Sequence, residues 1–270
     1  MKALLTGSTG FIGRNMLARL HFLDYEVIEI NEVFLDSSNW SEELRGRITS
    51  DIDVIFHVGA CSNTLEQNVN YIMKMNYEFT KQISILAEEL KIPVIYSSSA
   101  ASYGVDGKLP SNLYGWSKFS GEDYVIKSGG IALRYFNVYG PGEEDKGIMA
   151  SFLYQAYQRY RKGEKVKLFP GNPLRDFIYI EDVISANFHA FSNYNSLEKR
   201  YYEVGSGVQN SFESVLTLAG IDFEYLDDSD IPDGYQFSTQ SISSKWMQGW
   251  HPKFDLKTGV SDYLEYLKVD

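Results

Sequence analysis

Apolar residues in the first half of the chain alternate between two spacings. Short apolar runs, typical of buried strands, occupy residues 3–5, 25–30, 54–58, 94–96 and 131–136. Between them, apolar residues recur at helical spacing over residues 12–23 and 70–90, and a further helix is expected around 117–127. We also interpret Phe34-Leu35 as a very short strand. Strands that alternate with helices favour an α/β fold with a doubly wound parallel sheet.

The second half of the chain lacks this regular alternation. Residues 152–161 and 183–191 have helical spacing, whereas 166–169 and 177–180 look extended. We predict a first domain over residues 1–140, with later segments near 174–206 and 236–248 returning to it. The remainder of 141–270 is expected to form a smaller, interleaved cap domain that binds the substrate.

Charge and cysteine content exclude several functions. Lys plus Arg number 25 against 36 for Asp plus Glu, a formal net charge of −11, which disfavours nucleic acid as a partner. Cys61 has no second cysteine to pair with, and the four histidines show no metal-ligand spacing, so no metal is expected. The acidic run 227–230 is interpreted as a solvated loop, because it lacks the spacing of a calcium loop. No apolar run approaches the ~20 residues of a membrane span, and no signal-peptide pattern is present, so we expect a cytoplasmic protein without membrane attachment.

A glycine-rich turn lies between the first predicted strand and the first predicted helix. Backbone amides and the helix N-terminus at such a turn can hold a pyrophosphate. Glycines also serve ordinary tight turns, but the position between strand and helix favours a dinucleotide site in a Rossmann-type sheet. The predicted cofactor-binding residues here are Gly7, Thr9, Gly10, Phe11, Ile12 and Gly13.

The end of the second predicted strand should meet the adenosine ribose of a dinucleotide. An acidic residue is usual there, but Asn31 occupies the position, 18 residues after Gly13. Asparagine does not repel a 2′-phosphate, and Arg14 could add positive charge, so the pattern favours NADP over NAD. Glu32 is the counter-evidence, since it could act as the carboxylate if the strand ends one residue later.

Tyr114 and Lys118 have the YxxxK spacing, which places a phenol and an ammonium one helical turn apart. A nearby cation should lower the tyrosine pKa from about 10 toward the range of proton exchange with a sugar hydroxyl. The lysine can also bind the nicotinamide ribose. Upstream, Ser99 lies in a serine run after the strand 94–96 and would hydrogen-bond the reacting oxygen, with Ser98 as the alternative. Taken singly, each motif also fits a surface helix or a plain loop.

The order of these three elements, glycine turn, serine strand end and YxxxK, resembles the extended short-chain dehydrogenase/reductase superfamily. Longer stretches are similar to ADP-glycero-manno-heptose 6-epimerases, and these are HVGACSNT (57–64), RYFNVYGP (134–141), KGIMAS (146–151) and RDFIY (175–179). The resemblance implies a nucleotide-sugar epimerase that oxidises a sugar alcohol transiently to a ketone and reduces it again on the opposite face. It also implies a homo-oligomer.

The resemblance assigns further site residues. Lys146 matches a second acid/base position beside Tyr114 in the family. Gly59 and Ala60 match a turn that lines the cofactor, and Asp36 a position that contacts adenine. The substrate positions are Arg175, which would hold the diphosphate, together with Asn137, Phe169 and Tyr235. A solvent-exposed loop lysine is the plain alternative for Lys146.

This chain departs from the heptose epimerases on the sugar and nucleotide side. The departures are Ile148, Gln155, Pro170 and Gly234. They leave the identity of the substrate open, and a UDP-hexose 4-epimerase or another NDP-sugar oxidoreductase is the alternative enzyme. A non-catalytic dinucleotide-binding sensor is the alternative from another class.

Overall fold

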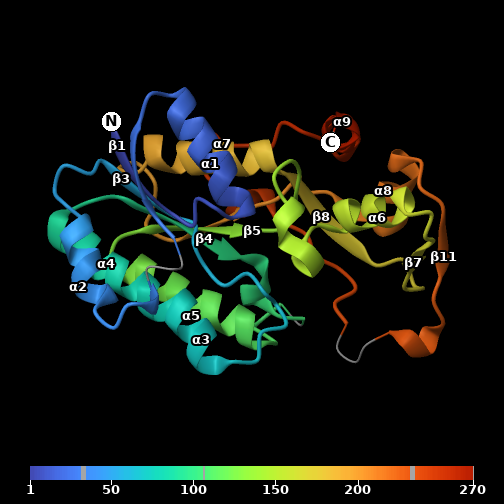
Figure 1. Cartoon of the computed structure of the whole chain (residues 1–270), viewed down its shortest axis with the longest axis horizontal. Coiled ribbons are helices and arrows are strands. Elements are labelled where there is room, and N and C mark those ends of the chain that lie inside the picture. Colours follow the sequence, from blue (N-terminus) through green and yellow to red (C-terminus); the bar gives the residue numbers. More distant parts are fainter. Residues whose placement is uncertain (32–34, 106, 232–234, 270) are drawn as a thin grey trace. The chain divides into compact units, whose positions relative to one another are not determined.

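The computed structural model describes residues 1–31, 35–105, 107–231 and 235–269 (Figure 1). The chain forms two compact units. The first comprises Met1–Tyr135 and Ile184–Tyr202, and the second comprises Phe136–Val183 and Glu203–Asp270.

A six-stranded sheet forms the centre of the first unit. Its order is β2-β1-β3-β4-β5-β9, and the pairings among the first five strands are parallel. The bounds are β1 Lys2–Thr6, β2 Glu26–Ile30, β3 Val54–His57, β4 Val94–Ser99, β5 Ile131–Tyr135 and β9 Tyr201–Val204. The strand order reverses at β1, and ligands of doubly wound sheets bind outside the carboxyl ends of the strands at such a point. The predicted fold class is confirmed.

Helices cover both faces of this sheet, with α1 on one side and α2 to α5 on the other (Figure 1). Their bounds are α1 Phe11–Phe22, α2 Trp40–Arg47, α3 Val69–Met73, α4 Phe79–Leu90, α5 Leu113–Lys127 and α7 Ile180–Ser192. Successive side chains along a strand point to opposite faces of the sheet. Leu4 and Ile55 are buried in one cluster with residues of α4 and α5, whereas Phe56 packs on Phe188 and Phe191 of α7.

Several elements of the first unit differ from the predicted ones. The predicted helix 70–90 contains a π-helical turn, η2 (Lys74–Glu78), between α3 and α4. Strand β4 continues through the serine run to Ser99, and α5 begins before Tyr114, at Leu113. Leu35 lies in a helical turn and not in a strand, because its buried side chain packs into the core beside α2 and α4. Phe34 and Glu32 lie outside the described residues.

The second unit is built from small sheets and short helices. A three-stranded sheet has the order β10-β8-β6, and β11 pairs with β7 in parallel. The strands are β6 Asn137–Tyr139, β7 Val166–Leu168, β8 Leu174–Tyr179, β10 Gln209–Ser211 and β11 Phe223–Tyr225. The helical segments are η4 Glu144–Met149, α6 Phe152–Arg161, α8 Phe212–Ala219, η5 Asp228–Asp230, η6 Ser243–Lys245 and α9 Leu256–Val269, while η3 (Ala100–Tyr103) belongs to the first unit.

The predicted domain boundaries need correction. The first unit ends at Tyr135 and not at residue 140, and the segment that returns to it is Ile184–Tyr202, shorter than 174–206. Strand β8 stays in the second unit because it pairs with β6 and β10. Residues 236–248 also belong to the second unit, since the Leu174 amide donates to the Phe237 carbonyl and Ser241 bonds to Asp176.

Within the residues that the structure describes, no helix has both the length and the apolar composition of a membrane span. No group of three or more His, Cys, Asp and Glu side chains among them could hold a metal ion. The acidic run forms a short turn in which Asp230 accepts a hydrogen bond from the Asp227 amide.

Candidate active site

The glycine turn packs against the turn that follows β3. A Cβ atom on Gly7, whose φ is +68°, would lie 2.5 Å from the Gly59 Cα, and one on Gly13 would lie 1.8 Å from the Gly7 carbonyl oxygen. Glycine is therefore required where the two turns and the start of α1 meet. The Gly10 N-cap of α1 makes no side-chain capping bond. These predicted residues fit a pyrophosphate, because the helix N-terminus is left to bind an anion.

The residues predicted to lie near the adenosine of a dinucleotide differ in their contacts. Asn31 Oδ1 lies 3.1 Å from the Ser8 hydroxyl, in the first half of the glycine turn. Arg14 donates to the Thr9 carbonyl at 2.9 Å. Asp36 is exposed. Glu29, which the sequence analysis missed, accepts a hydrogen bond from the Ser8 hydroxyl at 2.5 Å.

A buried histidine connects the glycine turn to the long helix of η2 and α4. The Thr80 hydroxyl donates to the Asn76 carbonyl at 2.8 Å, so His57 Nε2 must donate to Thr80, also at 2.8 Å. Nδ1 is then the acceptor of the Thr6 hydroxyl, which itself accepts from the Gly59 amide. Burial, with a smaller contribution from Lys118, lowers the pKa of His57 to about 3. His57 is therefore a neutral structural link between the end of β1 and helix α4.

Tyr114, Lys118 and Ser99 come together in the first unit. The N-cap Asn112 accepts from the Gly115 amide at 2.7 Å and starts α5 just before Tyr114. Lys118 is buried, with its ammonium 4.4 Å from the centre of the Tyr96 ring. Ser99 at the end of β4 hydrogen-bonds the Tyr114 side chain. Ser98 instead donates to Glu122 at 2.6 Å, which makes Ser99 the better match to the predicted serine.

The predicted effect on the tyrosine pKa is wrong in sign. Burial raises the pKa of Tyr114, and the hydrogen bond from Ser99 lowers it only in part. Burial also lowers the pKa of Lys118 to about 7, opposed by Glu122. Burial therefore shifts both side chains toward their neutral forms.

Asn76, a residue that the sequence analysis missed, connects the Cys61 backbone to the start of α5 near Tyr114. Its side chain accepts from the Cys61 amide at 2.7 Å and donates to the Cys61 carbonyl and to the Ser117 hydroxyl. Ser117 in turn donates to the Tyr114 carbonyl at 2.7 Å. Asn76 lies in the π-helical turn. The apolar residues keep helical spacing through residues 70–90, so no local signal in the sequence marked this position.

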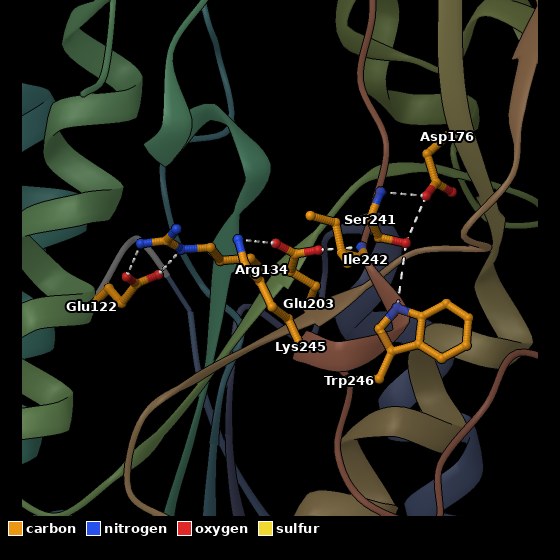
Figure 2. A network of polar contacts seen from close by, with 8 residues as sticks. All are labelled: Glu122, Arg134, Asp176, Glu203, Ser241, Ile242, Lys245 and Trp246. Atoms are coloured by element: carbon orange, nitrogen blue, oxygen red, sulfur yellow. Dashed lines mark hydrogen bonds and ion pairs between the residues drawn. The ribbon is translucent and has the colours of Figure 1, made fainter. Parts of the chain in front are cut away.

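A buried ion pair holds α5 against the sheet (Figure 2). Arg134 donates to both carboxylate oxygens of Glu122, at 2.8 and 2.5 Å. The guanidinium lies between Tyr103 and Tyr201, with its carbon 4.3 and 3.7 Å from the two ring centres. Glu122 is one helical turn after Lys118, and its carboxylate raises the pKa of that lysine against the larger effect of burial.

Lys146 lies in the second unit on η4, and it is half-buried rather than a free loop lysine. Burial lowers its pKa, and Glu143 opposes that change. Glu143 is fully buried and accepts from the Ser151 amide and hydroxyl, at 2.5 and 2.6 Å. Burial is also the largest cause that raises the pKa of Glu143.

The other predicted substrate residues gather in the second unit. Arg175 lies with its guanidinium carbon 5.4 Å from the centre of the Tyr235 ring, and Tyr235 is 5.1 Å from Phe169 in an edge-to-face contact. Phe237, which the sequence analysis missed, packs 5.2 Å from Tyr235. Asn137 is exposed and accepts from Thr239 at 3.4 Å. A cation beside several aromatic rings suits a diphosphate joined to a base.

Asp176 fixes the segment that carries Tyr235 (Figure 2). Its carboxylate accepts from the amide and hydroxyl of Ser241, at 2.8 and 2.7 Å, and from the amides of Ser206 and Gly207. Glu203 accepts from the Ile242 amide at 2.6 Å and pairs with Lys245 at 3.1 Å.

The departures from the family differ in their surroundings. Ile148 is 74% exposed. The Gln155 amide donates to the Ile148 and Ala150 carbonyls at 3.2 and 2.8 Å, so it holds the end of η4. Pro170 is partly buried. Gly234 lies outside the described residues.

Fold and site together define a dinucleotide-dependent α/β enzyme with a tyrosine–lysine pair. Residues 3–205 match the model of the NAD dependent epimerase/dehydratase family. The ADP-L-glycero-D-manno-heptose-6-epimerase of Brachyspira hyodysenteriae is 32% identical over 98% of this chain and 97% of its own length. The protein of the same name from Pseudomonas aeruginosa is 34% identical over 80% of this chain and 76% of its own.

A solved structure supports the same relationship. The Helicobacter pylori ADP-L-glycero-D-manno-heptose-6-epimerase has a TM-score of 0.87 and 27% identity, over 100% of this chain and 96% of that one. The chain therefore belongs to the NAD dependent epimerase/dehydratase family, and the predicted resemblance to the heptose 6-epimerases is confirmed.

Proposed function

We propose that this chain is a nucleotide-sugar epimerase that inverts one carbon of an NDP-sugar, with an ADP-heptose as the first candidate substrate. The observation that carries the proposal is the Ser99–Tyr114–Lys118 constellation, at the carboxyl end of β4 in the same sheet as the glycine turn. Such an arrangement can take a proton from a sugar hydroxyl and return it. The names of the relatives support the heptose.

The dinucleotide would be held by the glycine turn, Gly59, Asn31 and Lys118. When bound, it supplies the acceptor for a hydride from the sugar carbon and the donor that returns it. Tyr114 in its phenolate form would take the hydroxyl proton as the ketone forms and would give it back on re-reduction. Ser99 would hydrogen-bond the reacting oxygen in both directions, and the Lys118 ammonium would stabilise the phenolate. The preference for NADP over NAD remains a prediction.

Inversion requires proton transfer in two poses of the alcohol. We propose that Lys146 is the second acid/base group, and the lowering of its pKa by burial supports this assignment. Arg175 would bind the diphosphate, with Tyr235 and Phe169 beside the nucleotide. Asn137 would contact the sugar side.

The test is direct. Purified protein is analysed by mass spectrometry for bound dinucleotide and then incubated with ADP-heptose or with UDP-hexoses, while NMR follows the stereochemistry. We expect inversion at the 6″ carbon of the heptose with no net consumption of dinucleotide. Inversion at C4 of a UDP-hexose would show that the substrate is a UDP-hexose and not an ADP-heptose. Failure to bind any dinucleotide would contradict the proposed epimerase function.

A further inference from the structure

The aromatic ring of Tyr96 lies against the ammonium of Lys118. Lys118 Nζ is 4.4 Å from the centre of this ring, within the range of a cation–π contact. Tyr96 is on β4 and Lys118 on α5, and both residues are buried, with 0% and 3% of their surfaces exposed. A cation–π contact stabilises a charge most strongly where water is excluded, so this contact should matter for the charge of Lys118.

A glycine lets helix α5 approach the ring closely. Gly121 is three residues after Lys118, so the two positions share one face of α5. A Cβ atom on Gly121 would lie 2.8 Å from the Tyr96 hydroxyl oxygen and 2.7 Å from the Asn76 carbonyl oxygen. A larger residue at position 121 would therefore move the helix, and Lys118 with it, away from the ring.

The neighbouring strand β3 fixes the position of the ring. Tyr96 and His57 are register partners on β4 and β3, and the centres of their rings are 5.3 Å apart. His57 is itself held by Thr6 and Thr80, through one hydrogen bond of 2.8 Å at each ring nitrogen. A ring held in this way offers a preorganised face to the ammonium.

The groups that face Lys118 differ in charge. The carboxylate of Glu122 is one helical turn away, and Arg134 donates to both of its oxygens. The other groups are Tyr96, Tyr114, Cys61 and His57. Burial raises the pKa of Tyr96 well above its ordinary value, so this phenol is neutral at neutral pH. The ring therefore acts on the ammonium through the negative face of its π system and not as a phenolate.

We propose that Tyr96 is a positioning residue of the active site, whose ring face holds the Lys118 ammonium in place and favours its charged form. The inference rests on the proposed function, in which this ammonium stabilises the Tyr114 phenolate. Without the ring, Lys118 should lose its proton at a lower pH, and the stabilisation of the phenolate should be lost at the same lower pH.

The first experiment follows the titration of Lys118 by NMR in the full chain, prepared with isotope-labelled lysine. The absence of one signal in Lys118→Met assigns the resonance. Tyr96→Leu removes the ring, and we expect the pKa of Lys118 to fall by about one pH unit. Tyr96→Phe keeps the ring and deletes only the hydroxyl, so the pKa of Lys118 should stay close to its wild-type value.

Turnover supplies a second measurement on the same variants. In Tyr96→Leu the decline of kcat at high pH should begin about one pH unit lower than in the wild type, whereas Tyr96→Phe should follow the wild type. Tyr124→Leu is the matched control, because Tyr124 lies on the same helix and its ring contacts the exposed Lys81, at 5.7 Å. This control should change neither the Lys118 titration nor the pH profile of kcat.

A ring of altered electron density tests the contact even if Tyr96→Leu fails to fold. Polyfluorinated phenylalanine at position 96 keeps the approximate shape of the ring, and its fluorine atoms withdraw electron density from the ring face. The pKa of Lys118 should then fall below its value in Tyr96→Phe, and it should fall further as more fluorine atoms are added. Thermal melting identifies the variants that are folded.

The outcomes separate this inference from the proposed function. A Lys118 pKa that keeps its wild-type value in folded Tyr96→Leu, or that does not respond to fluorination, would overturn the inference and leave the proposed function intact. An equal fall in Tyr96→Phe and Tyr96→Leu would also overturn it, since that result assigns the effect to the hydroxyl. Wild-type protein that turns over no nucleotide-sugar would contradict the proposed function, and with it the part of Tyr96 in catalysis, whatever the NMR titration shows.

Discussion

Lys118 in the first unit and Lys146 in the second are both lysines whose pKa burial lowers and a nearby glutamate raises, and the two lysine–glutamate pairs are built differently. Lys118 and Glu122 lie one turn apart on α5, and Arg134 and Ser98 hold the glutamate from the neighbouring strands. Lys146 and Glu143 lie on or beside the short η4 segment, and Ser151 holds the glutamate. Burial lowers the pKa of both lysines, and in each the glutamate opposes the change.

The difference lies in what supports the backbone. Lys118 lies on a regular helix packed against a buried sheet. Lys146 lies beside Gly147, whose φ of 53° interrupts η4, and next to the exposed Ile148. Regular elements tolerate little change, whereas short exposed segments can vary without loss of the core. A short exposed segment of this kind leaves room for the departures predicted from the sequence at Ile148 and Gln155.

The largest effect is expected at the first pair. Tyr114→Phe removes the proton donor and acceptor, so turnover should fall about 10³-fold, within the range of general acid–base catalysis. Dinucleotide affinity should change little, because the ring remains. Steady-state kinetics and calorimetry measure the two quantities. Unchanged turnover would contradict the catalytic role of Tyr114, whereas a wild-type chain that binds the dinucleotide without turning over any nucleotide-sugar would favour the non-catalytic sensor.

A smaller loss tests the second pair. Lys146→Met should reduce epimerisation about 10²-fold if this lysine serves one of the two poses. Lys162→Met, on an exposed lysine just after α6, is the matched control and should retain full activity. A 4-epimerase that rotates the whole sugar would not need Lys146, and in that case the Lys146 variant would behave like the control.

Acid sensitivity should originate in the first unit. His57 has a folded pKa of about 3, below its unfolded value of 6.5, so the unfolded chain binds more protons between these pH values. Stability should therefore fall as the pH falls from 6.5, by about 2 kcal/mol at pH 5 from this group alone. Urea unfolding at pH 7 and pH 5 measures the loss, and NMR of the His57 ring should show no titration in that interval. A His57 ring that titrates near pH 6 would contradict the assigned neutral link.

The smallest effect concerns the carboxylate of Glu122 beside Lys118. The other groups that face the Lys118 side chain are Tyr96, Tyr114, Cys61 and His57. Replacing Glu122 by Gln together with Arg134→Met removes the carboxylate without leaving a buried guanidinium unpaired. Since Glu122 raises the lysine pKa, its loss should lower that pKa, and the decline of kcat at high pH should begin about one pH unit lower. Activity at pH 7 should fall by up to about tenfold. An unshifted pH profile with reduced activity would leave the ion pair a purely structural role.

Local patterns in the sequence were enough to predict the first five strands of the sheet, the glycine turn and the α-helices of the first unit except α2, but not strand β9. Hydrophobic spacing and glycine position are properties of a few neighbouring residues, so they can be recognised without knowing which distant residues they contact. The segment 236–248 was assigned to the wrong unit because its contacts with Asp176 and Leu174 span more than 60 residues, and no local signal reports them.

The sequence by itself determined that this chain forms a dinucleotide-type sheet with a tyrosine and a lysine one turn apart. Only the tertiary structure decided that Asn76 joins Cys61 to Ser117, that Glu29 shares Ser8 with Asn31, and that burial raises the pKa of Tyr114. The reason is physical: a pKa depends on desolvation and on charges brought from distant segments, and these quantities exist only once the chain has folded.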